Sequence, residues 1–211
     1  MARHRGRART PPIGIPAGVG AGTVEMNVAE VFRRITAALD QAGVRYMLTG
    51  SFASAYYGVP RSSQDIDLII EATPAQVQAF IQLLPGGEYY VDLDTALEAQ
   101  KQRSLFNVID MLTGWKIDLI FRKSRPFSEE EFGRRKQVVV QGFAIFAASA
   151  EDVAVAKLEW AKLAQSQRHI QDVAGILRMS WESLDHAYLE KWIVELGLST
   201  EWTDARRAAG V

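Results

Sequence analysis

Three aspartates in two short apolar runs have the types and spacing that metal chemistry requires. Asp65 and Asp67 are one residue apart at the start of one run, and Asp118 lies in another, 116–121. Residues two apart on a strand point to the same face, so the first two carboxylates are expected to lie side by side. Such like charges repel unless a cation lies between them. Mg²⁺ favours one or two carboxylates together with phosphate oxygens, so the pattern predicts chemistry on a phosphate compound.

Each part of this pattern has a plainer interpretation. An isolated Asp-x-Asp is usually a solvated loop, but here the apolar run 68–70 follows and favours the polar end of a buried strand. Asp118 stands between Ile117 and Leu119. A lone carboxylate inside such a run is costly to bury without a cation or hydrogen-bond donors, which favours a ligand role.

Gly50 and Ser51 close a short apolar run, 45–49, and open a segment of helical character. Glycine allows a phosphate to approach the backbone closely, and a helix N-terminus offers free N–H groups to an anion. A Gly-Ser pair alone usually marks a turn. Its position just before the paired aspartates favours phosphate binding.

Two cations are candidates for the same site. Arg61 precedes the aspartate pair by four residues, where it could hold phosphate, orient the carboxylates or remain a surface arginine. Lys157 emerges from an apolar helical stripe, so it either pairs with a carboxylate or phosphate or extends to solvent.

Other polar and aromatic residues of the C-terminal half are interpreted structurally. Asp172 lies four residues after Arg168, which predicts an ion pair on a helix surface, with packing near the site as the second alternative. His169 is expected at the surface, with a general base as its alternative. The later tryptophans are expected to pack in the core and between helices, with stacking of one of them on a base as the alternative; they are Trp160, Trp181, Trp192 and Trp202.

The hydrophobic periodicity predicts an α/β (α+β) core followed by a helical portion. Expected helices span 28–39, 51–57, 73–84, 94–102, 128–135, 150–164, 167–179, 182–196 and 200–209, and expected strands span 45–49, 66–70, 89–91, 105–111, 116–121, 138–140 and 143–146. Thr73 and Pro74 predict a capped helix start, and Ser149 predicts another. We therefore expect a core over 26–148 and a helical region over 149–211.

Composition restricts the functional classes. The 211 residues include no cysteine, so disulfides, thiolate catalysis and cysteine-bound zinc are excluded, and a cytoplasmic location is expected. No apolar run approaches the length of about 20 residues that spans a bilayer. Residues 1–25 carry four arginines and one glutamate and are predicted to be a disordered basic tail. The remainder holds 20 basic and 24 acidic residues, a net charge of −4 that argues against a large duplex nucleic-acid surface.

The chain resembles the nucleotidyltransferase superfamily to which DNA polymerase beta belongs. The resemblance rests on the runs 49–53, 61–68 and 117–120, which give a Gly-Ser pair, a paired aspartate motif and a lone aspartate in that order. The run 151–157, with the later Arg168 and Asp172, is similar to small bacterial members related to the abortive-infection AbiEii-type proteins. Those toxins often carry Gly-Gly at the first motif and threonine where Ser63 stands.

This resemblance implies a small mixed β-sheet core and transfer of a nucleoside monophosphate from a nucleoside triphosphate, such as ATP, to a hydroxyl acceptor. Mg²⁺ or Mn²⁺ would be the cofactor. The acceptor would be on RNA, protein or a small molecule, and a toxin–antitoxin or phage-defence setting would add a cognate antitoxin. The metal-binding and catalytic residues would be Asp65, Asp67 and Asp118. The nucleotide-binding residues would be Gly50, Ser51, Arg61 and Lys157. The alternatives are a nucleotide-sensing or partner-binding protein that keeps the fold without turnover, and a structural helical protein.

Overall fold

The computed structural model describes residues 28–140 and 142–211, so the predicted basic tail lies outside the described residues. Helices and strands alternate through the first two thirds, and helices alone follow. The strands are β1 (Arg45–Leu48), β2 (Asp65–Glu71), β3 (Tyr89–Tyr90), β4 (Leu105–Asp110), β5 (Lys116–Phe121), β6 (Lys136–Val140) and β7 (Phe143–Ala147). The helices are α1 (Val28–Gln41), α2 (Gly50–Tyr57), α3 (Pro74–Leu83), α4 (Leu93–Gln102), α5 (Pro126–Gly133), α6 (Ala150–Ala164), α7 (Gln167–Ser180), α8 (His186–Glu195) and α9 (Ser199–Ala209).

The strands form one mixed seven-stranded sheet in the order β3-β4-β5-β2-β1-β7-β6. At its centre β2 runs parallel to β5 and antiparallel to β1. Burial alternates along β2, with Ile66, Leu68 and Ile70 buried on one face of the sheet. The intervening residues, Asp65 and Asp67 among them, face the other side because side chains alternate along a strand.

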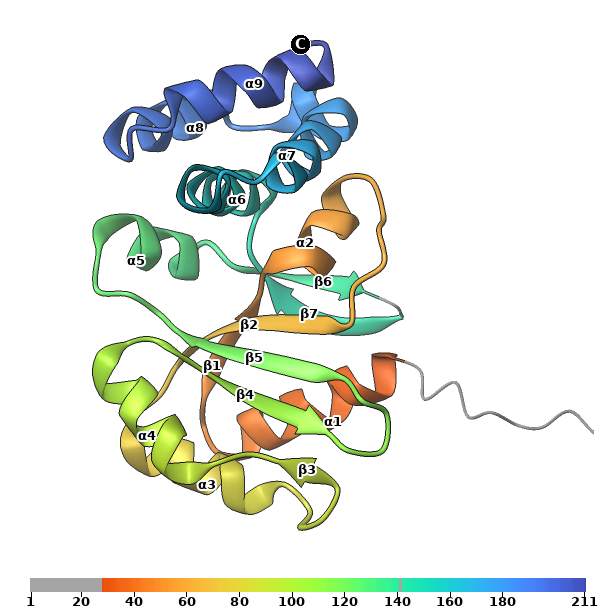
Figure 1. The fold of residues 1–211 in the computed structure, drawn as a ribbon, viewed down its shortest axis with the longest axis vertical. Helices are drawn as coiled ribbons and strands as arrows, with labels where there is room; N and C mark the ends of the chain where they lie inside the picture. The colour runs from red at the N-terminus through yellow and green to blue at the C-terminus, as the bar shows by residue number, and fades with distance from the viewer. Residues whose placement is uncertain (1–27, 141) are drawn as a thin grey trace, which may run out of the picture.

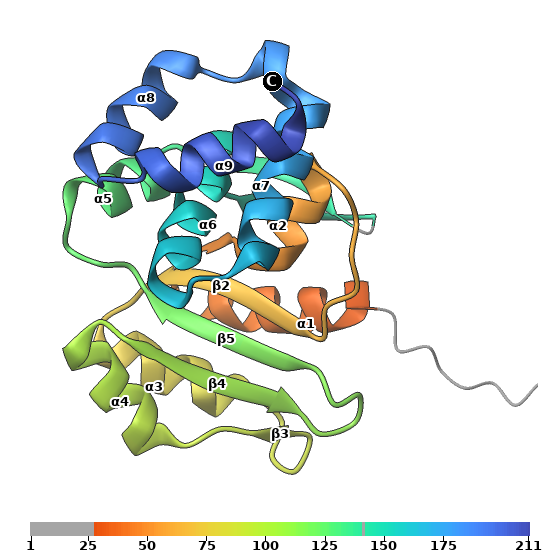
Figure 2. The ribbon, with the colours of Figure 1, turned by 45° about the horizontal axis from the view of Figure 1, so that its top comes forward.

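Helices cover the sheet in two groups. In Figure 1, α3 and α4 lie at the lower end of the molecule, while α6, α7, α8 and α9 gather at the upper end. The turned view in Figure 2 keeps these groups apart and shows α2 beside α6 and α7. Contacts of α2 with β2, α6 and α7 agree with this view. The helical region therefore faces the strand face that carries the aspartates.

The predicted α/β fold class is confirmed, and the predicted helix starts at Thr73 and Ser149 are observed. Thr73 and Gln76 form a reciprocal capping box before Pro74. The Ser149 side chain accepts a hydrogen bond from the Asp152 N–H at 3.2 Å. Among the described helices, none is both long and apolar enough to cross a membrane.

Two helix starts differ from the prediction by more than one residue. The helix expected over 128–135 begins at Pro126, because proline is well suited to the first helical position. The segment expected over 182–196 is a 3₁₀ turn, Trp181–Ser183, followed by α8. Asp185 separates the two, because its side chain accepts a hydrogen bond from the Tyr188 N–H at 3.0 Å and caps α8.

Candidate functional site

The two central parallel strands bring the aspartates to one face of the sheet. In the register of β2 and β5, Asp67 lies directly opposite Asp118, and Asp65 lies opposite Lys116. All four side chains share a face because they are separated by even numbers of residues along each strand. The structure thus places the three predicted carboxylates together, and it adds a lysine that the sequence interpretation missed.

Asp67 carries negative charge that its protein surroundings do not balance. Burial, and next the negative charge of Asp118, raise the pKa of Asp67 to about 6. The backbone N–H of Ser51 donates to Asp67 Oδ2 at 3.4 Å and opposes this shift only in part. A carboxyl group in this position would gain from any nearby cation.

Lys116 lies between the other two carboxylates. Its Nζ is 3.4 Å from Asp65 Oδ1 and 3.1 Å from Asp118 Oδ2. Although burial alone would lower the pKa of Lys116, the hydrogen bond and charge of Asp118 raise it. Asn107, opposite Asp118 on β4, donates a hydrogen bond to the second oxygen of that carboxylate. An ammonium group therefore occupies the space where the strand register gathers the acids.

The side chains as they lie do not form a metal centre. Within residues 28–140 and 142–211, no group of three or more histidine, aspartate or glutamate side chains is arranged to hold a metal ion. The donor chemistry nevertheless suits Mg²⁺, since carboxylate oxygens on adjacent strands face one cavity, and burial together with the charge of Asp118 raises the pKa of Asp67. Lys116 would have to move for Asp65 and Asp118 to share an ion.

Two features of the backbone require glycine at position 50: its left-handed conformation and the close approach of Asp67. The φ of Gly50 is +63°, in the left-handed region that favours glycine. A Cβ added at Gly50 would lie 2.5 Å from Asp67 Cγ and 2.7 Å from Asp67 Cβ. The close approach that the Gly-Ser pair predicted is therefore seen toward a carboxylate, and it sets the N-terminus of α2 against the acidic strand.

A chain of polar contacts ties this turn to the helical region. Arg61 donates to the Ser51 hydroxyl, and its Nε lies 3.1 Å from Asp172 Oδ1. Lys157 Nζ lies 2.7 Å from Asp172 Oδ2, and its side chain is 5% exposed. The interpretation of Arg61 as a surface arginine is thus wrong, and Lys157 takes the carboxylate-paired alternative.

The expected surface pair of Asp172 with Arg168 is wrong, and Asp172 takes its other alternative, packing near the site. It pairs with Lys157 and Arg61, because α7 turns this carboxylate toward α6 and toward the loop that follows α2. Burial would raise the pKa of Asp172, but hydrogen bonds from Lys157 and Arg61 lower it. Burial lowers the pKa of Lys157, which shares its carboxylate with the repelling Arg61. The only sequence signal for this cluster was the apolar surroundings of Lys157.

These groups line a cavity of about 440 Å³, here named the carboxylate cavity. Its lining includes Gly50, Ser51, Arg61, Asp65, Asp67, Asp118, Lys157, Trp160 and His169. Trp160 was expected in the core, but it is 56% exposed. His169 was expected at the surface, yet its Nδ1 is buried and lacks a hydrogen-bond partner among the described residues. Burial, and next the charge of Lys157, lower the pKa of His169, so it is neutral near pH 7.

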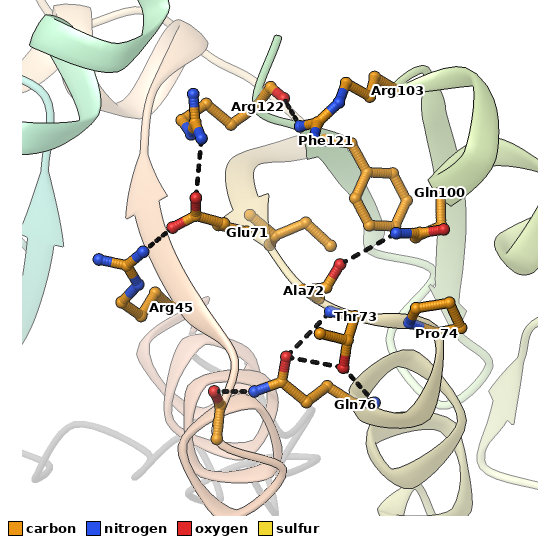
Figure 3. Close-up of a pocket in the computed structure, with 12 residues that line it drawn as sticks. Arg45, Glu71, Ala72, Thr73, Pro74, Gln76, Gln100, Arg103, Phe121 and Arg122 are labelled. Atoms are coloured by element: carbon orange, nitrogen blue, oxygen red, sulfur yellow. Dashed lines mark hydrogen bonds and ion pairs between the residues drawn. The ribbon is translucent and has the colours of Figure 1, made fainter. Parts of the chain in front are cut away.

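A second cavity of about 490 Å³, the Glu71 cavity, lies where β2 and β5 end. Figure 3 shows Arg45 and Arg122 converging on Glu71 from two sides. Although burial alone would raise it, the hydrogen bond from Arg122 and the charge of Arg45 lower the pKa of Glu71. Charge is already balanced here, so the smaller carboxylate cavity is the better candidate for a cation-dependent site.

Comparison with known proteins supports the fold. No protein-family model and no curated protein matches the chain. Among solved structures, the solution structure of the antibiotic-resistance factor ANT(2'')-Ia matches with a TM-score of 0.54 and 15% identity, over 86% of this chain and 97% of that one. A nucleotidyltransferase-like protein from Paracoccidioides brasiliensis matches with a TM-score of 0.54 and 14% identity, over 87% and 94%.

A crystal structure of ANT(2'')-Ia in complex with adenylyl-2''-tobramycin matches with a TM-score of 0.52 and 14% identity, over 83% of this chain and 98% of that one. Identities this low show the fold alone. The chain therefore has the fold of nucleotidyltransferases, in agreement with the superfamily that its motifs resemble.

Proposed function

We propose that this protein is a metal-dependent nucleotidyltransferase, which moves a nucleoside monophosphate from a nucleoside triphosphate to a hydroxyl acceptor. The observation that carries the proposal is the register of β2 and β5, which sets Asp67 opposite Asp118 and next to the N-terminus of α2. An incompletely balanced carboxylate, Asp67, and a helix N-terminus in one cavity suit a ligand that combines cations with phosphate groups.

The nucleotide-binding residues surround the carboxylates on the helix side. Gly50 and Ser51 would accept the triphosphate at the start of α2, where the helix dipole favours anions. Arg61 and Lys157 line the same cavity and add positive charge. Asp172 holds both cations in place, so they are oriented before a nucleotide arrives.

Asp65, Asp67 and Asp118 would hold Mg²⁺ or Mn²⁺. When bound, such ions neutralise phosphate charge and activate the attacking and leaving oxygens. The acceptor hydroxyl oxygen forms a bond to the α-phosphorus, and the bond from that phosphorus to the pyrophosphate oxygen breaks. Asp118 orients the hydroxyl and takes its proton, and pyrophosphate leaves with the electron pair of the broken bond.

Two observations guide the choice of acceptor. The AbiEii-like motifs favour an acceptor on tRNA or protein, in a toxin–antitoxin or phage-defence setting with a cognate antitoxin. The likeness to ANT(2'')-Ia, whose complex contains adenylyl-2''-tobramycin, favours a small hydroxylated molecule. We therefore propose testing the three acceptor classes side by side.

The test uses the full chain with each α-³²P-labelled nucleoside triphosphate and Mg²⁺. Bulk tRNA, the protein itself and tobramycin are offered as acceptors, and pyrophosphate release is measured in parallel. We expect label on one acceptor class and none with the Asp118→Asn variant. Nucleotide binding in calorimetry without transfer to any acceptor would instead support the non-catalytic sensing role.

A further inference from the structure

A smaller cavity adjoins the carboxylate cavity and has no part in the steps above. It measures about 150 Å³ and is here named the Glu131 cavity. The two cavities share four lining residues: Thr49, Ile120, Ala156 and Trp160. A molecule held at the carboxylates can therefore extend directly into the second space.

The strands set the distance between the two cavities. Ile69 and Ile120 are opposite each other, and each lies two residues beyond its aspartate on the same face of the sheet. At about 3.3 Å per residue, this apolar floor begins about 7 Å from the carboxylates, which is the reach of one sugar ring. A nucleotide with its α-phosphate at Asp67 and Asp118 would bring its base over these isoleucines.

The cavity walls suit a planar ring. Trp160 lines both cavities and is 56% exposed, so one of its surfaces is free to contact a ligand. Phe127 and Leu163 add further apolar lining. A cavity of about 150 Å³ has room for a single aromatic ring.

Glu131 is a buried polar side chain of this cavity whose hydrogen bonding is incomplete among the described residues. The side chain is 3% exposed and lines the cavity, and Oε1 lacks a hydrogen-bond partner in the part of the chain that the structure describes. Burial, and next the charge of Asp152, raise the pKa of Glu131 to about 8. A neutral carboxyl group offers one donor and one acceptor side by side. By contrast, Arg125 and Glu159 on the same wall already satisfy each other through two bonds of 2.6 Å.

We infer that the Glu131 cavity binds the nucleobase of the triphosphate, with Trp160 stacking on the ring and Glu131 bonding to its polar edge. Base-handling enzymes combine these same two contacts, aromatic stacking and hydrogen bonds to the base edge. The hydrogen bonds of Glu131 do not by themselves require one base, whereas room for a single ring favours a pyrimidine over a purine. The inference rests on the proposed function, since it places one part of the proposed substrate.

The experiment compares a ligand that has a base with one that lacks it. Calorimetry with Mg²⁺ measures the affinity of the full chain for ATP, CTP, GTP and UTP, and separately for inorganic tripolyphosphate. The variants are Trp160→Ala and Glu131→Leu. Trp160→Phe keeps an aromatic face, and Met179→Ala is a matched control because Met179 is 69% exposed and outside the cavity.

We expect Trp160→Ala to weaken binding of the preferred nucleotide by about fivefold to a hundredfold, the range that stacking contacts give. Glu131→Leu should also weaken it, while both variants bind tripolyphosphate as the wild type does. Trp160→Phe should recover most of the affinity, and Met179→Ala should change nothing.

Unchanged nucleotide affinity in both variants would overturn the base assignment and leave the proposed function intact. Equal weakening of nucleotide and tripolyphosphate would also overturn it, because the cavity would then act on the phosphates. If the wild type binds neither ligand, the proposed function fails, and the inference fails with it.

Discussion

The two ends of the β2–β5 strand pair place carboxylates in opposite electrostatic surroundings. At one end Asp67 faces Asp118, and its pKa is raised to about 6. At the other end Glu71 receives Arg45 and Arg122, and its pKa is lowered (Figure 3). One strand thus carries an unbalanced acid and a balanced one, four residues apart on the same face of the sheet.

This difference separates a structural ion pair from a site that awaits a ligand. The Glu71 cavity is larger, yet its acid already has its cations. The carboxylate cavity keeps an acid at the cost of stability, which proteins do mainly where function requires it. Volume alone would have favoured the Glu71 cavity, whereas the charge balance favours the carboxylate cavity.

The largest expected difference between the two ends is in the rate of nucleotidyl transfer. Asp67→Asn should reduce nucleotidyl transfer by at least about a hundredfold, because even residues that only support metal ligands cost up to that much. Glu71→Gln should stay within about threefold of wild type, since it touches no proposed ligand. Initial rates of label transfer measure both, and equal losses in the two variants would remove the distinction between the ends.

A substitution at Gly50 tests how much the close contact with Asp67 contributes to stability. Gly50→Ala should lower the free energy of unfolding by about 3 kcal/mol, since it adds a left-handed alanine and a clash with Asp67. Gly87→Ala is the matched control, because Gly87 has φ of +84° and open space around it. That variant should lose only about 1 kcal/mol. Urea denaturation measures the free energy of unfolding of both variants. Equal losses would show that the contact with Asp67 adds nothing to the cost of a side chain at position 50.

Stability against pH should show opposite signs at the two ends. The folded pKa of Asp67 lies above its unfolded value, so its ionisation opposes folding. We therefore expect the free energy of unfolding of Asp67→Asn to equal that of wild type below about pH 4 and to rise above it between about pH 4 and 6. Above that range the variant should remain about 1–2 kcal/mol more stable, after allowance for partial exposure.

Glu71 should behave in the reverse sense. Its lowered pKa means that the charged form stabilises the fold at neutral pH, and this stability is lost as the pH falls through the folded pKa. Glu71→Gln should lower the free energy of unfolding by less than about 1 kcal/mol at pH 7 and not at all in acid, because Glu71 is partly exposed and Arg45 is largely exposed. Urea midpoints from pH 3 to 8 measure both variants, and a stabilising Glu71→Gln would contradict the balanced-pair interpretation.

The smallest expected effect concerns Lys116. Its ammonium lies between Asp65 and Asp118, so it should compete with a divalent ion. Lys116→Met should raise the affinity for free Mn²⁺ by about fivefold or more, as removal of one positive charge near the site predicts. Electron paramagnetic resonance measures the concentration of free Mn²⁺ at each protein concentration, from which the affinity follows. Weaker Mn²⁺ binding in the variant would show that Lys116 supports the site instead of blocking it.

Local signals made most of the fold predictable. The capped start of α3 needed only Thr73, Pro74 and Gln76, which are neighbours in sequence. The gathering of the aspartates followed from the period of two in strands, together with adjacent placement of β2 and β5. The helix cap and the shared face of Asp65 and Asp67 depend on neighbouring residues alone, whereas the place of Asp118 beside them depends on the long-range pairing of β2 with β5.

The missed residues depend on how helices pack. Asp172 has a plausible partner one turn away in Arg168, and only the placement of α7 against α6 and α2 gives it Lys157 and Arg61. Trp160 looked like core, since large aromatics usually are, but it faces the cavities. Glu131 lay in a charged segment whose burial no local pattern indicates.

The chain of contacts from Ser51 through Arg61 and Asp172 to Lys157 has a consequence for dissection of the protein. A fragment that stops at residue 148 would keep every acidic ligand candidate but would lose the anchor that orients its arginine. It would also expose the buried contacts of α2 with α6 and α7. Residues 28–148 would therefore lack two of the groups that order the proposed nucleotide site, Lys157 and Asp172, which the last third of the chain supplies.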